Sequence, residues 1–172
     1  MVSNPRFVEM PQPLGLFAGD LFKRGIEYLD AFEFLNKDRE QFQFAGCFLF
    51  AHSLELLLKS FLAAHEVTKH EIRYVLRHDL PEILKRCKEY SFPFVAYLDQ
   101  YAAHTFEMNK DFDFRYPSGF VLTMPRPAEC APIARGLAAA IQPIVFKASK
   151  DANLKFASET RIHKGKKIRW SD

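Results

Sequence analysis

Apolar side chains in residues 41–65 point in almost every direction around a helix. The apolar positions of this segment are Phe44, Ala45, Phe48, Leu49, Leu54, Leu56, Leu57, Leu58, Phe61 and Leu62. A helix that is apolar on nearly every side must be contacted on several sides. The pattern therefore predicts a long central helix, which is covered by other helices or shared across a dimer interface.

Shorter helical patterns precede and follow this segment. Asp20 can cap a helix that ends near Asn36, and Asp79, followed by Pro81 in the first turn, marks the start of another. Apolar residues at helical spacing predict helices over residues 20–36, 80–90, 93–108 and 128–146. The sequence therefore predicts an all-α fold, an antiparallel bundle of four to five helices.

The pattern changes near the C-terminus, where apolar and polar residues alternate. The alternation runs from Leu154 to Ile162, ahead of Gly165, and resumes at Ile168 and Trp170. Alternation on both sides of a turn predicts a C-terminal β-hairpin.

These patterns divide the chain into a leader (residues 1–18), a helical bundle (residues 19–147) and a basic extension (residues 148–172) that contains the hairpin. The net charge is only +3, but from Lys147 onward eight Lys and Arg stand against three Asp and Glu. Such a tail is most often a solvated segment, and it also suits an acidic partner such as nucleic acid.

The length of 172 residues and the hydrophobic content of 48% fit one domain. Cys47, Cys87 and Cys130 are odd in number and widely spaced, so we expect buried thiols in a reducing compartment. Residues 1–13 lack the basic-then-apolar layout of a signal peptide. The sequence therefore predicts a cytoplasmic protein with no membrane partner. The spacing of its polar residues indicates neither a metal nor a cofactor.

One narrow polar stripe interrupts the apolar central helix. His52, Glu55 and Lys59 are separated by three and four residues, so they stack along one line of the helix surface. A Glu–Lys pair at this spacing contributes only about 0.2 to 0.5 kcal/mol on an exposed surface. In a partly buried groove the pair needs further partners, because an unpaired buried charge is costly. We therefore expect Arg115 or His78 to lie close to the stripe.

Three short motifs occur in a fixed order along the chain. They are Glu55-x-x-x-Lys59 within residues 51–62, then His78-Asp79-Leu80, then Arg115-Tyr116-Pro117. In this order they resemble the HEPN superfamily, the higher eukaryote and prokaryote nucleotide-binding domains. Members show a Glu-x-x-x-Lys on the second helix, a His-Asp-Leu that opens the third and, in one branch, an Arg-Tyr-Pro after it. The similarity spans residues 21–145.

The resemblance implies an antiparallel bundle of four or more helices, usually paired as a homodimer. It also implies binding of nucleotides or RNA, often in toxin–antitoxin or defence systems, with a separate nucleotidyltransferase or antitoxin protein as partner. The residues predicted to line the ligand groove are His52, Glu55, Lys59, Arg77, Arg115 and Tyr116. Pro117 stiffens the backbone after Tyr116, which could present a guanidinium to a phosphate and a ring to a base. Equally, Arg115 could cap a helix while Tyr116 fills the core.

Many active members of the superfamily are metal-independent ribonucleases with an Arg-x4-6-His motif, and Arg73 and His78 satisfy this spacing. His78 would then move a proton while Arg73 stabilises charge on the phosphate. Two features differ from the family pattern, because Tyr74 follows the Arg and the motif precedes the third helix. The bulk of Tyr74, Val75 and Leu76 also favours anchoring of this connector to the core, which would leave Arg73 and His78 divergent.

The primary prediction is therefore a non-catalytic nucleotide- or RNA-binding module, in which His78 starts a helix and holds the connector by a hydrogen bond. The alternative is a metal-independent endoribonuclease that uses Arg73 and His78. A third hypothesis is a structural interaction domain.

Overall fold

The computed structural model describes residues 7–36, 42–110, 114, 126–163 and 166–171. Its helices are α1 (Leu14–Asn36), α2 (Gln43–Ala64), α3 (Leu80–Lys88), α4 (Leu98–Asn109) and α5 (Pro127–Glu159), with a π-helical turn η2 (Glu71–Val75) and a 3-10 turn η3 (Thr160–His163). Two short strands, β1 (Phe7–Pro11) and β2 (Lys167–Ser171), lie near the chain ends. The predicted helical bundle is confirmed.

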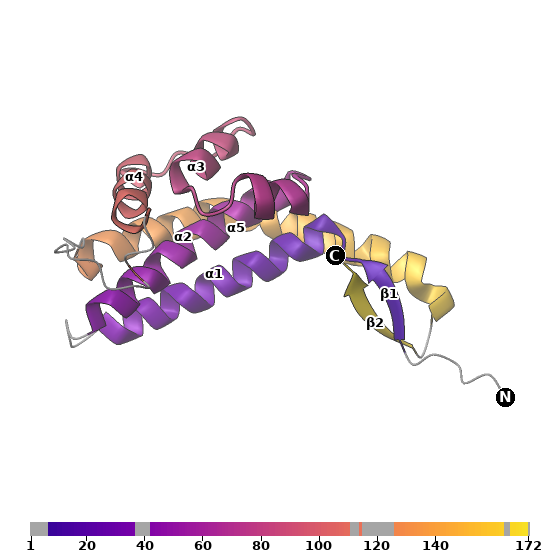
Figure 1. The fold of residues 1–172 in the computed structure, drawn as a ribbon. Helices are drawn as coiled ribbons and strands as arrows, with labels where there is room; N and C mark the ends of the chain where they lie inside the picture. Colours follow the sequence, from indigo (N-terminus) through magenta and orange to yellow (C-terminus); the bar gives the residue numbers. More distant parts are fainter. Residues whose placement is uncertain (1–6, 37–41, 111–113, 115–125, 164–165, 172) are drawn as a thin grey trace.

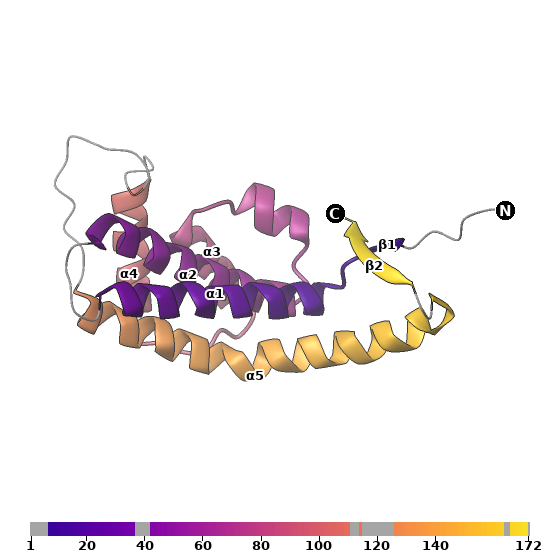
Figure 2. The same ribbon diagram turned by 90° about the horizontal axis from the view of Figure 1, so that it is seen from below.

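Helices α1, α2 and α5 are long and pack along one another, while α3 and α4 cover α2 from the side away from α1 (Figures 1 and 2). Helix α2 is buried without interruption over residues 53–63. Leu57, Leu58 and Phe61 are completely buried. The central position predicted for this helix is confirmed.

By length and composition alone, α2 could also cross a membrane. In this fold 78% of its most apolar window is buried inside the protein, as in the core helix of a helical bundle.

Helix α1 begins at Leu14 rather than at the predicted Asp20, which lies inside the helix and accepts a hydrogen bond from Gln12 at 2.6 Å. The reason is a close crossing with α5. A Cβ atom on Gly15 would collide with the backbone oxygen of Ala148, so only glycine permits this approach. The crossing gives the first turns of α1 a surface to pack against.

Helix α5 continues to Glu159, so its predicted end near residue 146 is wrong. The first strand of the predicted hairpin is wrong for the same reason, because residues 154–159 are helical. Ala148 and Ala152 meet the start of α1 at Gly15. This packing, together with the high helix propensity of alanine, outweighs a short alternating pattern.

The second predicted strand forms as β2, but it pairs in parallel with β1 at the other end of the chain, not in a hairpin. Val8 pairs with Ile168 and Met10 with Trp170. The Trp170 ring contacts Phe156 of α5 with ring centroids 5.2 Å apart. The small sheet therefore closes against the end of α5, beyond the bundle (Figures 1 and 2).

Candidate functional site

A connector of residues 65–79 joins α2 to α3 and carries several of the predicted site residues. Within it η2 makes a single π-helical turn, and the side chains of Ile72 and Leu76 are buried in the core. Tyr74 and Val75, by contrast, are 66% and 64% exposed. The connector is thus anchored to the core by Ile72 and Leu76, and not by Tyr74 or Val75.

Arg77 adopts a left-handed backbone conformation with φ of 48°. This is uncommon for a residue other than glycine, and it persists where surrounding contacts impose it. Here the contact comes from Lys59, whose ammonium group donates a hydrogen bond to the Arg77 carbonyl oxygen. Lys59 therefore fixes the connector to α2.

Glu55 is the centre of a buried polar cluster. Its carboxylate accepts from the Lys59 ammonium at 2.7 Å, and the Nδ1 atom of His78 lies 3.0 Å from one of its oxygens. His52 lies farther away, with Nδ1 3.8 Å from the carboxylate. Glu55 and Lys59 are only 7% and 6% exposed. The predicted contact between the stripe and His78 is present.

The protonation of Glu55 reflects two opposing effects. Burial by itself raises the pKa of a carboxyl group, because the charged form loses its hydration. The polar interaction with His52, the positive charge and hydrogen bond of Lys59 and the hydrogen bond with His78 outweigh this cost and lower the pKa of Glu55 to about 2. Glu55 is therefore a carboxylate at neutral pH.

A cavity of about 500 Å³ lies above this cluster, between α2, the connector and α4. The connector and α4 stand on the same side of α2 (Figure 1). The lining residues from α2 are Phe48, Ala51, His52 and Glu55, those from the connector and the start of α3 are Arg73, Arg77, His78, Asp79 and Leu80, and those from α4 and its C-terminus are Thr105, Phe106, Asn109 and Lys110.

The elements around the cavity differ in chemistry. The connector contributes two guanidinium groups and an imidazole, whereas α2 and α4 contribute Phe48 and Phe106 together with polar groups and the charged side chains of Glu55 and Lys110. Arg73 also packs against an aromatic ring of α1, since its guanidinium lies 5.5 Å from the ring centroid of Phe17. The cavity can therefore accept a ligand with an anionic end and an apolar end.

The cavity brings together most of the residues predicted from the sequence. His52, Glu55, Arg73, Arg77 and His78 all line it. Lys59 lies beneath it and supports Glu55 and the Arg77 carbonyl. Arg73, on η2, and His78, three residues after this turn, both line the cavity, and the expected divergence of their side chains stays a prediction. Arg115 and Tyr116 lie outside the described residues.

Sequence reasoning missed the contribution of α4. Thr105, Phe106 and Asn109 come from a helix about fifty residues after the polar stripe, and no motif connects them. One signal was available, because Thr105 is a polar residue between the apolar positions Ala102 and Met108 on the buried face of α4. Its side chain is 1% exposed.

Metal binding and thiol chemistry are two further possibilities for the part of the chain that the structure describes. There, no three His, Cys, Asp or Glu side chains are grouped so as to hold a metal ion. The expected burial of the cysteines is confirmed. Burial raises the pKa of the Cys47 and Cys130 thiols to about 12, which disfavours the reactive thiolate.

Comparisons with protein-family models, curated proteins and solved structures give no match for this chain. The resemblance to the HEPN superfamily therefore rests on the three motifs, and it stays a prediction.

Proposed function

We propose that this protein is a HEPN-like, non-catalytic module that binds a nucleotide or RNA through a phosphate group in the cavity above Glu55. The observation that carries the proposal is the placement of Arg77 at a cavity whose carboxylates are already engaged within the protein. The carboxylate of Glu55 is engaged by Lys59 and His78, and Asp79 accepts a hydrogen bond from the backbone N–H of Glu82 at 2.9 Å. The positive groups of the connector thus face a cavity whose acidic groups are already occupied.

The geometry of the connector supports the same proposal. Guanidinium groups bind phosphate oxygens with several directed hydrogen bonds. Arg73 is held over Phe17, and the backbone of Arg77 is held by Lys59, so binding would lose less conformational freedom than at a mobile surface. A volume of about 500 Å³ also lies within the range of small-molecule sites.

The experiment that tests this function is equilibrium binding of nucleoside monophosphates and short single-stranded RNA by calorimetry. Removal of a guanidinium from the phosphate site should lower affinity at least about tenfold, since charged hydrogen bonds contribute about 1.5 to 3 kcal/mol. We therefore expect this loss in Arg77→Ala. The matched control is Arg24→Ala, which removes an exposed guanidinium from α1. Equal affinities for the two variants would contradict the proposal.

A second function is favoured by one contact. Glu55 engages Nδ1 of His78, which orients the imidazole and leaves Nε2 as the nitrogen able to exchange a proton. In a ribonuclease, that nitrogen would take the proton of an RNA 2′-hydroxyl while the 2′-oxygen attacks phosphorus, and the leaving 5′-oxygen would be protonated by a general acid. Arg73 would stabilise the charge on the phosphate.

The ribonuclease alternative is separated from binding by one assay. We expect no cleavage of single-stranded RNA in the presence of a chelator. Cleavage that resists the chelator and disappears in both Arg73→Ala and His78→Ala, with the fold retained, would establish the alternative.

The proposed partners rest on the resemblance alone. By that resemblance the protein works as a homodimer in a toxin–antitoxin or defence system, beside a separate nucleotidyltransferase or antitoxin protein. Sedimentation of the purified chain at several concentrations tests the dimer, and a monomer at all concentrations would count against it.

A further inference from the structure

Thr105 on α4 is an anomaly within the otherwise apolar buried face of its helix. Its side chain is 1% exposed, and its Oγ1 atom is fully buried without a hydrogen-bond partner among the described residues. Buried hydroxyl groups are nearly always paired, because an unpaired one loses its bonds to water without replacement. The same residue lines the cavity. An unpaired group at this place indicates a ligand that supplies the missing partner.

Asn109 stands one helical turn after Thr105, so both side chains lie on the same face of α4. The amide oxygen of Asn109 accepts a hydrogen bond from the backbone N–H of Phe114 at 3.3 Å. This contact sets the orientation of the amide, with its NH2 group as the remaining donor. Besides the Lys110 ammonium, the α4 end of the cavity therefore holds two uncharged donors, a hydroxyl and an amide.

Aromatic side chains adjoin these donors. Phe106 from α4 and Phe48 from α2 both line the cavity. The ring of Phe48 is stacked on the imidazole of His52, with centroids 5.5 Å apart and planes 15° apart. A flat ring that packs against Phe48 or Phe106 would lie in the same cavity as Thr105 and Asn109.

We propose that the α4 end of the cavity is a nucleobase subsite, in which Thr105 and Asn109 donate hydrogen bonds to acceptor atoms on the edge of the base. This proposal rests on phosphate binding at the connector, as argued above. The base lies against Phe48 and Phe106, and the phosphate lies against Arg77 and His78. Bases bind proteins by such a combination of aromatic stacking and edge hydrogen bonds.

The arrangement excludes two simpler ligands. Inorganic phosphate would occupy only the connector end and would leave Thr105 unpaired. An acyl chain would suit the two phenylalanines but would also leave the hydroxyl without a partner. A nucleoside phosphate, either free or at the end of an RNA chain, satisfies both ends of the cavity.

The test compares adenosine monophosphate, uridine monophosphate and ribose 5-phosphate on the full chain by calorimetry. We expect a nucleoside monophosphate to bind at least about tenfold more tightly than ribose 5-phosphate, since a stacked base contributes about that much or more. In Thr105→Val this advantage should fall at least fivefold, whereas the affinity for ribose 5-phosphate should not change. Thr105→Ser keeps the hydroxyl and should keep the advantage.

Thermal unfolding gives a second readout. Valine has the shape of threonine without the unpaired hydroxyl, so Thr105→Val should unfold at the same or a higher temperature than the wild type. Thr160→Val, which lies on η3 outside the cavity, is the matched control and should not change binding. A purely structural threonine would instead lower the melting temperature on replacement and leave base preference unchanged.

Three outcomes separate the two proposals. Equal affinities for ribose 5-phosphate and both nucleotides would overturn the base subsite and leave phosphate binding in place. An undiminished nucleotide preference in Thr105→Val would also overturn it. Failure of all three ligands to bind the wild type would overturn phosphate binding itself, and the base subsite with it.

Discussion

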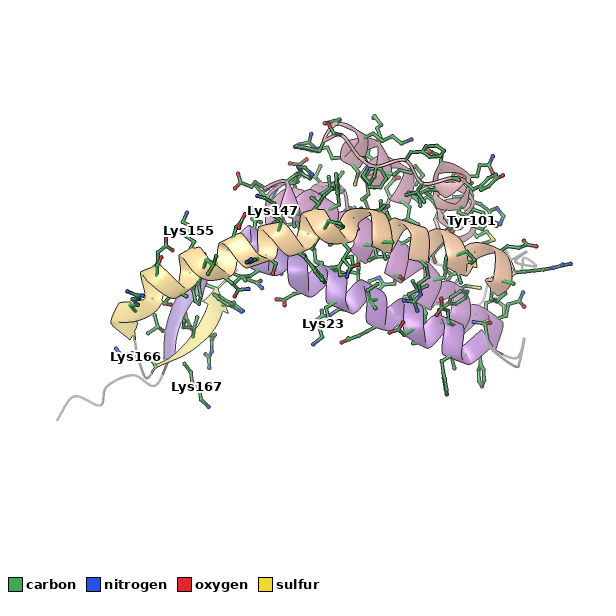
Figure 3. All side chains as sticks on the ribbon, turned by 180° about the vertical axis from the view of Figure 1, so that it is seen from behind. Lys23, Tyr101, Lys147, Lys155, Lys166 and Lys167 are labelled. Carbon is green, nitrogen blue, oxygen red and sulfur yellow. The ribbon has the colours of Figure 1, made fainter. Side chains whose placement is uncertain are left out.

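Positive charge has different roles beneath the cavity, where α2 meets the connector, and in the C-terminal arm, here residues 147–171. Lys59 beneath the cavity is 6% exposed and is bound by both a carboxylate and a carbonyl oxygen. The side chain of Lys147, where α5 leaves the bundle, is 82% exposed. Figure 3 shows Lys155, Lys166 and Lys167 spread along the arm beyond it. The first lysine holds a structure together, while the others create a positive field around the arm.

This difference predicts unequal effects of the same substitution. Lys59→Met should lower the free energy of unfolding by about 3 kcal/mol, because it leaves a buried carboxylate without its main cation. Lys150→Met, at an exposed position of α5, should change it by less than about 0.5 kcal/mol. Urea unfolding of the two variants measures both values. A similar small change in both would mean that the connector is not held through Lys59.

The same contrast explains how much of the molecule could be predicted from the sequence. Apolar residues on all sides of α2 require burial on all sides, so the central position of this helix could be predicted directly. The polar stripe was predictable too, because His52, Glu55 and Lys59 are fixed in relation to one another by helix geometry. The need for a further partner, Arg115 or His78, followed from the cost of an isolated buried charge, and the contact with His78 is present.

Non-local packing accounts for the errors. The extension of α5 depends on Gly15 and Ala148, which lie more than a hundred residues apart. The pairing of β2 with β1 joins the two chain ends, and neither strand indicates its partner. In the site, Thr105 became visible as a lining residue only once α4 had been placed against α2. The local pattern of α4 marks Thr105 as a polar residue on an apolar face, but it does not say what that face contacts.

Acid should weaken the fold by protonating Glu55 beneath the cavity. Because folding lowers the pKa of Glu55 from 4.5 to about 2, its charge stabilises the fold above pH 4.5. That stabilisation is lost as the pH falls from 4.5 toward 2, and it amounts to about 3 kcal/mol by linkage. The difference in unfolding free energy between wild type and Glu55→Gln should therefore narrow over this pH range. A difference that stays constant from pH 6 to pH 3 would contradict a charged, paired Glu55.

The smallest expected effect is a change in the salt dependence of RNA binding by the arm. Exposed lysines neutralise phosphates and release counterions, so binding of single-stranded RNA should weaken as salt increases. Replacing Lys150 and Lys155 with alanine should reduce the slope of log affinity against log salt by about 1.4, or about 0.7 for each lost contact. Mononucleotide binding should not change. An unaltered slope, measured by fluorescence anisotropy, would show that the arm does not contact RNA.

The central claim is that the cavity between α2, the connector and α4 is the ligand site. Amide chemical-shift mapping of the isotope-labelled chain with adenosine monophosphate tests it most directly. We predict that the largest shifts fall on His52, Arg77, His78, Thr105 and Asn109, which all line the cavity. Shifts confined to the arm, or the absence of shifts at millimolar nucleotide, would contradict the account.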